Sequence, residues 1–476
     1  MHTGIEEQQA LYQKRIPIFT RSVRGKFRSF KSAVLVLAYT VFFSLPWLPW
    51  ARSSGPSQPI AFDLGARRFY LFDVVMFPQD VIWLALLLAI AATLLFFVTG
   101  LVGRAFCGYF CFQTLWTDAF IAIERFIQGE RPARIRLYKQ GWDAEKTIKL
   151  LLTHGAWLAL ALATALTFIL YFGDAQTLLM DFWRGEAAGA AYITVIVLTL
   201  TTYIAAGWAR EQVCTYMCPY ARFQGVMYDP ETLTVLYDEK RGEGPRGRAS
   251  ARPGLKTRDE RLQQGHGDCI DCGFCVQVCP AGIDIREGLQ YQCISCGLCA
   301  DACNTIMDSM GYPRGLIRYD SEANLAAALP RPPRIDWRRY KVVGYGMAMV
   351  SLSALLVFAV GARDLHEGSV QQVRQPLYVV MGDGSIRNRY QIRINNKTDV
   401  DHIYRIEVQG IPQAALDLGS LREIKVRAGK SLTVQASVRL DQATAARTRD
   451  FELTIVPIRE PQHAAHKRAH FSTRTG

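Results

Sequence analysis

Long apolar runs, separated by polar and charged stretches, dominate most of the chain. A helix needs about 20 apolar residues to cross a bilayer, and five segments of this kind carry few or no charges. They are residues 32–50, 80–102, 148–172, 187–208 and 341–361. The pattern predicts an α-helical bundle of five membrane spans, in which the first four form a membrane domain over residues 32–208.

The positive charges indicate the side of the membrane on which each connecting segment lies. Lys and Arg are concentrated in residues 1–31, 103–147 and 209–340, whereas the loop 173–186 holds one arginine and three acidic residues. Cytoplasmic loops carry the excess of Lys and Arg. We therefore expect the basic segments in the cytoplasm and residues 362–476 on the outer side of the membrane. The net charge of +13 is then mainly a topology signal. We expect no nucleic-acid partner, because the basic residues are not interleaved with aromatic ones.

The pattern changes to period two from about residue 372 to residue 457. Five short runs alternate apolar and polar residues and are separated by turn residues: 389–394, 402–408, 424–426, 432–438 and 451–456. Short alternating strands of this kind are typical of an all-β immunoglobulin-like sandwich. We expect this domain to have a docking or scaffolding role. His463, His466 and His470 follow it, and a flexible basic tail explains them better than a metal site on one helical face.

The twelve cysteines all lie in segments that we expect on the cytoplasmic side. Disulfides persist mainly in oxidising compartments, so this distribution favours reduced thiols that bind metal or carry electrons. Eight cysteines form two runs with the spacing C-x2-C-x2-C-x3-C, the ligand pattern of paired [4Fe–4S] clusters. Zinc sites lack this tandem arrangement. We predict an inserted bacterial-type 2[4Fe–4S] ferredoxin domain at about residues 262–312, within the segment 209–340.

The fourth cysteine of each run is expected to bind the cluster of the other run. One cluster is then held by Cys269, Cys272, Cys275 and Cys303. The other cluster is held by Cys279, Cys293, Cys296 and Cys299. Crossed ligation keeps two clusters close together and leaves no iron without a cysteine. The arrangement therefore favours electron relay over substrate chemistry at an open iron.

The remaining four cysteines form an internal repeat. Cys107 and Cys111 share the pattern C-x-Y-x-C with Cys214 and Cys218, and each pair directly follows a predicted span. Residues four apart share a helix face, so two packed copies could bring four thiolates together. Soft thiolates select Cu(I), zinc or an iron–sulfur cluster. Buried structural cysteines and a redox-active dithiol without metal remain open alternatives.

These motifs together resemble the CcoG (FixG/RdxA) family, which comprises accessory proteins of cbb-type cytochrome c oxidase. The resemblance rests on the repeated cysteine pairs, the sequence from Pro219 to Gln224, the tandem cysteine runs and the β domain, and the stretches 107–118 and 282–290 are specific to the family. It implies a polyferredoxin-like membrane protein that reduces Cu(II) to Cu(I) for the copper centre of the oxidase. The family normally has proline after the second cysteine of each membrane pair, and Phe112 departs from this pattern.

The sequence leads to one main hypothesis and two alternatives. A cytoplasmic electron donor reduces the two clusters, and single electrons then reach copper at Cys107, Cys111, Cys214 and Cys218. The resemblance implies that the partner is cbb-type cytochrome c oxidase or one of its assembly factors. The first alternative is a quinol-linked electron-transfer subunit, similar to the membrane ferredoxin proteins of periplasmic nitrate reduction. The second is a copper-binding assembly scaffold without turnover.

Overall fold

The computed structural model describes residues 17–52, 55–65, 67–77, 80–327, 331–362, 365–398 and 400–473. The chain divides into two compact units. Unit 1 contains residues 1–48, 60–63 and 84–354, and unit 2 contains residues 49–59, 64–83 and 355–476. Lys14 and Arg15, which contribute to the basic charge before the first predicted span, lie outside the described residues.

Six helical stretches among the described residues are long and apolar enough to cross a membrane. They are Lys26–Trp47, Val81–Val102, Ala105–Gln128, Ala144–Leu170, Gly189–Ala209 and Tyr340–Gly361. Five of them correspond to the predicted spans. Ala105–Gln128 is additional, and it differs from the others because 50% of its most apolar window is buried inside the chain, against 6–33% for the rest. The chain is a multispanning membrane protein with one further apolar helix packed inside it.

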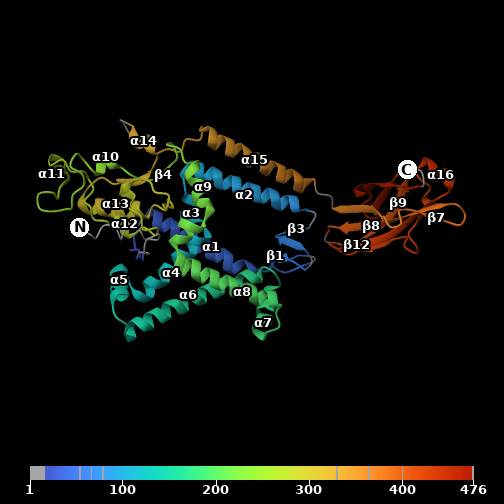
Figure 1. The fold of residues 1–476 in the computed structure, drawn as a ribbon, viewed down its shortest axis with the longest axis horizontal. Coiled ribbons are helices and arrows are strands. Elements are labelled where there is room, and N and C mark those ends of the chain that lie inside the picture. The colour runs from blue at the N-terminus through green and yellow to red at the C-terminus, as the bar shows by residue number, and fades with distance from the viewer. Residues whose placement is uncertain are drawn as a thin grey trace, which may run out of the picture. The chain divides into compact units, whose positions relative to one another are not determined.

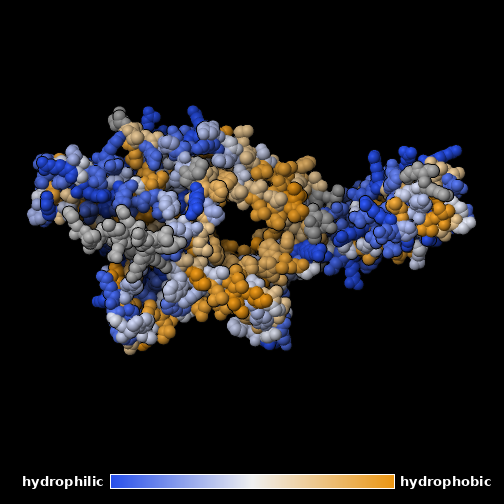
Figure 2. Space-filling model, in the orientation of Figure 1, coloured by the Kyte–Doolittle hydropathy of each residue, from blue (hydrophilic) through white to orange (hydrophobic). Residues whose placement is uncertain are grey.

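The apolar runs form long helices (Figure 1). Figure 2 shows hydrophobic residues gathered on α2, α8 and α15 and hydrophilic residues over the cysteine-rich part of unit 1.

Asp143 starts α6 by accepting a hydrogen bond from the backbone N–H of Lys146, which satisfies one of the free N–H groups of the first turn. The helices are α1 (Lys26–Ser44), α2 (Val81–Val102), α3 (Ala105–Tyr109), α4 (Phe112–Gln128), α5 (Arg131–Lys139), α6 (Ala144–Leu170), α7 (Ala175–Arg184), α8 (Gly189–Thr202), α9 (Pro219–Met227) and α15 (Tyr340–Gly361).

Helix α4 packs against α6 through buried small and aromatic side chains. Trp116 donates a hydrogen bond from Nε1 to Thr164 Oγ1 at 2.9 Å, and Trp157 donates to the Phe120 carbonyl oxygen at 3.1 Å. Phe120 is fully buried between these partners. Both indole N–H groups of this interface thus have a partner, as polar groups away from water require.

The cysteine-rich module lies between α9 and α15 and is built on short elements. Its strands β4 (Thr234–Tyr237) and β5 (Ile317–Asp320) pair antiparallel, so they bring the two ends of the module together. The helices are α10 (Glu239–Gly242), α11 (Arg258–Gln263), α12 (Phe274–Gln277), α13 (Leu298–Met310) and α14 (Glu322–Ala326). The core contains five buried cysteines together with Ile, Met and Val side chains. The cysteines are therefore part of the packing of this module.

Unit 2 contains a β-sandwich whose two sheets face each other (Figure 1). One sheet has the order β10-β12-β8-β6, with β7 paired to β8, and the other has the order β11-β9-β13-β14. The strands of the first sheet are β6 (His366–Gln372), β7 (Val379–Val380), β8 (Ile386–Asn396), β10 (Leu416–Asp417) and β12 (Ser431–Leu440). Those of the second are β9 (His402–Gln409), β11 (Ile424–Val426), β13 (Asp450–Pro457) and β14 (Ala465–His470). The short helix α16 (Gln442–Arg447) joins β12 to β13, and residues 64–83 add the hairpin β2 (Arg68–Leu71) and β3 (Val74–Met76).

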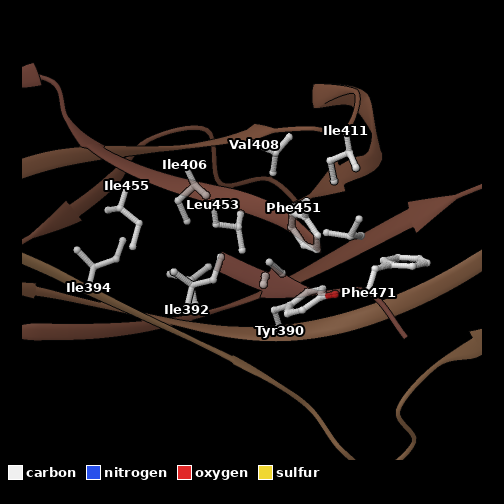
Figure 3. Packing of buried hydrophobic residues seen from close by; sticks show 14 of the residues in the cluster. Tyr390, Ile392, Ile394, Ile406, Val408, Ile411, Phe451, Leu453, Ile455 and Phe471 are labelled. Atoms are coloured by element: carbon white, nitrogen blue, oxygen red, sulfur yellow. The ribbon is translucent and has the colours of Figure 1, made fainter. Parts of the chain in front are cut away.

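The sandwich core follows the period-two pattern of the sequence. Figure 3 shows Tyr390, Ile392 and Ile394 of β8 packed against Leu453 and Ile455 of β13. The predicted immunoglobulin-like sandwich is confirmed. The interpretation of the C-terminal histidines as a flexible tail is wrong, because β14 pairs with β13 over residues 465–470. The alternation of β14 is weak because its residues are mostly basic, and this edge strand therefore resembles a tail in sequence.

Candidate functional site

Two adjoining cavities in the cysteine-rich module are each lined by a set of four cysteines. One cavity is lined by Cys269, Cys272, Cys275 and Cys303. The other is lined by Cys279, Cys293, Cys296 and Cys299, together with Cys275. Helix α13 carries Cys299 and Cys303 one turn apart, so it contributes a ligand to each cavity. The structure thus brings together the two sets of four that crossed ligation predicts.

The two cysteine runs adopt the same backbone conformation around their second cysteine. The residues on either side of it have positive φ in both runs: Asp271 (51°) and Gly273 (64°) in the first, Ser295 (48°) and Gly297 (70°) in the second. Gly297 is also close to α1, because a Cβ there would lie 2.6 Å from the ring of Phe27. Successive turns of this type point backbone N–H groups into a concave site, which is the geometry that a polyanionic cluster requires.

Ser295 anchors the second cysteine run. Its backbone N–H donates to Cys293 Sγ at 3.4 Å, and its hydroxyl is 3.1 Å from Thr234 Oγ1 on β4. Its carbonyl oxygen accepts a hydrogen bond from the Tyr319 hydroxyl on β5. Through these hydrogen bonds the serine links the β4–β5 pair to a sulfur ligand. Hydrogen bonds to sulfur are among the factors that set the reduction potential of an iron–sulfur site.

Burial opposes ionisation of these thiols. It raises the pKa of Cys275 and Cys293 to about 11, and that of Cys279 and Cys303 to about 12, with the neighbouring thiols adding smaller effects. A buried thiol loses its proton readily only when a cation compensates the charge. Four convergent, desolvated sulfur ligands in a cavity of this shape therefore fit an iron–sulfur cluster.

A basic side chain borders the first cavity. Arg286 lines it and donates hydrogen bonds to Asp284 and, at 2.6 Å, to Asp271 Oδ1. The pKa of Arg286 is raised, first by the hydrogen bond to Asp284 and further by Cys275 and Asp271. The arginine therefore remains charged beside the thiolates and offsets part of their negative charge.

The two C-x-Y-x-C motifs have a common feature at their second cysteine. Cys111 immediately precedes α4 and Cys218 immediately precedes α9, both with extended backbone (φ −65°, ψ 129° and φ −81°, ψ 110°). Phe112 therefore starts its helix as Pro219 does. The first cysteines differ, because Cys107 lies in the α-helical turn α3 whereas Cys214 lies in a π-helical turn, Val213–Met217. Each second cysteine therefore lies directly before the N-terminus of a helix.

The first of these motifs is in direct contact with the second cysteine run. The Tyr109 hydroxyl donates to the Cys296 carbonyl oxygen at 2.8 Å. A Cβ on Gly108 would lie 2.6 Å from the Ile294 carbonyl oxygen and 3.0 Å from Cys296 Cα, so the two backbones approach as closely as glycine permits. Cys107 is buried in the same cluster as Cys296. The first C-x-Y-x-C motif is therefore in direct contact with the backbone of the cysteine run that lines one of the two cavities.

The four membrane-proximal thiols lie in one neighbourhood. Burial raises the pKa of Cys214 to about 11, and the thiols of Cys111, Cys107 and Cys218 each affect it. Cys214 also lines a cavity together with the charged residues Lys31, Asp118 and Arg210. The buried thiol of Cys107 is 3.7 Å from Gln224 Oε1. The arrangement places the four sulfur atoms close enough to influence one another, and Cys214 connects them to this cavity.

The contacts that attach α1 to this region have no signal in the sequence. The Arg28 backbone N–H donates to Asp301 Oδ2 at 2.8 Å, and its guanidinium contacts Asp118 Oδ1 at 2.8 Å. The buried amine of Lys31 is 3.7 Å from the same Asp118 oxygen. These partners are 90 and 273 residues apart in the sequence, so nothing in the local pattern could indicate them.

Comparisons with known proteins identify an iron–sulfur domain and an Ig-like domain in this chain. Residues 209–322 match the family described as a 4Fe-4S dicluster domain, and residues 356–474 match the IG-like fold at the C-terminal of FixG. Protein RdxB of Cereibacter sphaeroides is 42% identical, with 98% of this chain and 97% of RdxB covered. Protein RdxA of the same organism is 43% identical over 84% of each chain. The nitrogen fixation protein FixG of Rhizobium meliloti is 39% identical over 85% of this chain and 82% of FixG. A FixG-related protein from Vibrio parahaemolyticus, known from a crystal structure, is 18% identical and covers 24% of this chain and 99% of its own, with a TM-score of 0.21.

Proposed function

We propose that this chain, which belongs to the FixG/RdxA family of iron–sulfur proteins, transfers single electrons to Cu²⁺. The transfer takes place at the cytoplasmic face of a bacterial inner membrane. The observation that carries the proposal is the contact of Gly108 and Tyr109 with Cys296. It joins the first of the two motifs, which together offer four thiols for a soft metal, to the module that offers two sets of cluster ligands. The Cu⁺ product then passes to a cbb-type cytochrome c oxidase or to one of its assembly factors.

The eight cysteines of the module are proposed as the cluster ligands. Cys269, Cys272, Cys275 and Cys303 hold one [4Fe–4S] cluster, and Cys279, Cys293, Cys296 and Cys299 hold the other. When bound, the clusters supply one-electron redox chemistry. The apolar side chains around the cavities exclude water, and Arg286 compensates charge at the first one.

The four membrane-proximal thiols are proposed to bind copper as the substrate. A Cu²⁺ ion held by these thiolates accepts one electron and becomes Cu⁺, and the electron comes from a soluble cytoplasmic one-electron donor. Thiolates favour this direction, because soft sulfur ligands stabilise Cu⁺. Cys107 is buried, whereas Cys111, Cys214 and Cys218 are partly exposed, so copper can approach from the side of the exposed thiols.

The charge contacts of α1 support five membrane crossings. Asp118 lies in the middle of α4 and contacts Arg28 and Lys31 in the first turns of α1. Arg28 also contacts Asp301 of the cysteine-rich module. A helix that crossed the membrane would hold its middle residue near the bilayer centre, away from the start of another span. We therefore assign α4 to the cytoplasmic boundary, which leaves the C-terminal sandwich in the periplasm.

The proposal is tested by a reductase assay on the purified full chain in detergent. The chain is reduced in the absence of oxygen and mixed with Cu²⁺ and a chromogenic Cu⁺ chelator. We expect the wild type to form Cu⁺ up to the number of electrons stored in its clusters, and this to be lost in Cys214→Ser and Cys218→Ser, while iron and acid-labile sulfide remain at two clusters per chain. Met217→Ser is the matched control, because Met217 is 71% exposed in the same turn. Reduction that persists in both cysteine variants overturns the proposal, and copper binding without turnover favours a scaffold role.

A second candidate function is favoured by an aromatic cavity beside α6. His154 and Trp208 stack with ring centroids 5.7 Å apart, and His154 Nδ1 is 3.0 Å from the Tyr203 hydroxyl. Both His154 and Trp208 line the cavity together with Trp157 and Glu124. Aromatic walls with a few convergent polar groups suit a planar ligand such as a quinol. Quinol oxidation that is lost in His154→Phe, with no copper retained by the chain, would favour this function over copper reduction.

A further inference from the structure

Two buried histidines begin strands of opposite sheets in the sandwich of unit 2. His366 is the first residue of β6 and is 4% exposed, and His402 is the first residue of β9 and is 1% exposed. Glu460 follows the end of β13, where Pro457 is paired with Tyr404 of β9. The sandwich therefore brings a residue from each sheet and one from a connecting turn to the same end of the domain.

The three side chains converge at distances that suit a single ion. One ligand atom of His366, one of His402 and one of Glu460 all lie within 4.8 Å of one another. His366 Nε2 is 3.2 Å from Glu460 Oε2, and the two imidazole rings have their centroids 4.7 Å apart. The opposite nitrogen of His366, Nδ1, is 2.8 Å from the Tyr404 hydroxyl. Tyr404 thus fixes the ring and leaves Nε2 directed at Glu460.

His402 gives an independent indication of a missing ligand. Neither of its ring nitrogens has a hydrogen-bond partner among the residues that the structure describes, although the side chain is almost completely buried. Buried polar groups are nearly always paired. A buried imidazole that is packed beside another imidazole, with no hydrogen-bond partner in the described part of the chain, is positioned to bind an ion.

The cationic groups near this end of the domain have their own partners. His402 and Glu460 line a cavity with Arg52, Arg68 and Lys397. The Lys397 amine contacts Asp80 at 3.3 Å and Glu367 at 3.1 Å, and Arg52 donates to the carbonyl oxygens of residues in the 56–72 segment. Arg68 lies over the Phe77 ring at 5.5 Å. These charges are engaged elsewhere, so Glu460 is available to a cation.

We infer that His366, His402 and Glu460 form a binding site for a divalent first-row transition-metal ion, with Cu²⁺ bound most tightly. Two imidazoles and one carboxylate are typical ligands of such ions, and three protein ligands leave a coordination position open. Among these metals Cu²⁺ forms the strongest complexes with a given set of nitrogen and oxygen ligands. Tyr404 is a positioning residue, because it orients a ligand without touching the metal.

This site is independent of the proposed reductase. It lies in unit 2 and uses nitrogen and oxygen ligands, whereas the proposed copper substrate is held by sulfur ligands in unit 1. The two sets of ligands suit different oxidation states, since imidazole and carboxylate suit Cu²⁺ and thiolate suits Cu⁺. The site would remain if copper reduction were disproved.

The test uses the full chain in detergent, with its clusters oxidised and its accessible thiols alkylated. One equivalent of Cu²⁺ is added, and electron paramagnetic resonance is recorded together with the nitrogen modulation that imidazole ligands produce. We expect a Cu²⁺ signal with two imidazole ligands in the wild type and its loss in His402→Ala. Tyr404→Phe should keep the signal and weaken Cu²⁺ binding by about 10- to 100-fold, as outer-shell partners of metal ligands do.

The controls separate a built site from surface binding. His470→Ala should leave the signal unchanged, because His470 is exposed on β14 and contacts Asp450 instead. Glu460→Gln, at a side chain that is 38% exposed, should weaken binding without affecting folding, which the unfolding midpoint without metal monitors. A wild-type chain without the two-imidazole signal overturns the inference, and so does a signal that survives both His402→Ala and His366→Ala.

Discussion

The Tyr109 hydroxyl donates a hydrogen bond of 2.8 Å to the carbonyl oxygen of Cys296. Tyr109 is the central residue of the first C-x-Y-x-C motif, and Cys296 is the second cysteine of the second run. Both residues are buried. The bond ties the first motif to the second cysteine run, and the proposed electron transfer to copper would cross this contact.

Loss of this hydroxyl should loosen the junction. Tyr109→Phe leaves a buried carbonyl without a partner, which costs about 1–3 kcal/mol. We expect a lower midpoint for thermal loss of the visible iron–sulfur absorbance, with unchanged iron content at low temperature. Tyr216→Phe changes the equivalent residue of the second motif, which is 70% exposed, and should leave the midpoint in place. Equal midpoints for both variants would show that the hydrogen bond does not hold the junction.

A methyl group at Gly108 should separate the motif from the module. The added Cβ would meet the Ile294 carbonyl oxygen at 2.6 Å and Cys296 Cα at 3.0 Å, and backbone atoms cannot move away cheaply. We expect Gly108→Ala to slow copper reduction at least about tenfold, equivalent to 1.4 kcal/mol in the barrier, with both clusters retained. Gly155→Ala in α6, where no atom lies within 4 Å of the added Cβ, is the control. Wild-type rates in Gly108→Ala would contradict the role of this contact.

Crossed ligation predicts which cysteine variants affect the same cluster. Cys279→Ser and Cys293→Ser should alter the same cluster, because both side chains line one cavity. Cys303→Ser and Cys269→Ser should alter the other. Electron paramagnetic resonance of the reduced variants distinguishes the two clusters. If the Cys279→Ser spectrum matched that of Cys269→Ser, each run would hold its own cluster and the crossing would be disproved.

The ion pairs of Asp118 should stabilise unit 1. Asp118→Asn leaves Lys31, whose side chain is 2% exposed, without its acidic partner, and breaking a buried pair in this way costs about 3–5 kcal/mol. We expect a marked fall in the thermal unfolding midpoint. Lys149→Gln removes an exposed pair with Glu145 in the same unit, and such surface pairs contribute only about 0.3–0.5 kcal/mol. Similar midpoints for the two variants would contradict the buried-pair account.

The sequence predicted the parts that depend on local pattern. The spans, the sandwich strands and the two cysteine runs follow from apolar length, period two and ligand spacing, and the resemblance to the FixG/RdxA family is confirmed by the relatives. The apolar helix α4 was missed as an element, because Asp118 and Glu124 interrupt its pattern. Both acids have partners in other elements, which are Arg28 and Lys31 for Asp118 and Arg134 and Arg210 for Glu124.

The contacts between distant segments could not be predicted from the sequence. Tyr109 contacts Cys296 across 187 residues of sequence, and no periodicity predicts such a contact. The cluster of His366, His402 and Glu460 could not be predicted for the same reason. Each residue lies at an end of a different element, and a lone histidine at the start of a strand has no distinctive pattern.

The most direct test of the central claim is a single-turnover measurement. The prereduced full chain is mixed in the absence of oxygen with Cu²⁺ and a Cu⁺ chelator, and the recovery of oxidised-cluster absorbance is followed together with Cu⁺ formation. The account predicts that both signals share one rate constant, that one Cu⁺ forms for each electron lost, and that both signals disappear in the Cys214→Ser, Cys218→Ser double variant. Cluster reoxidation at the wild-type rate in that variant would contradict it, because Cu²⁺ would then take its electron without the membrane-proximal thiols.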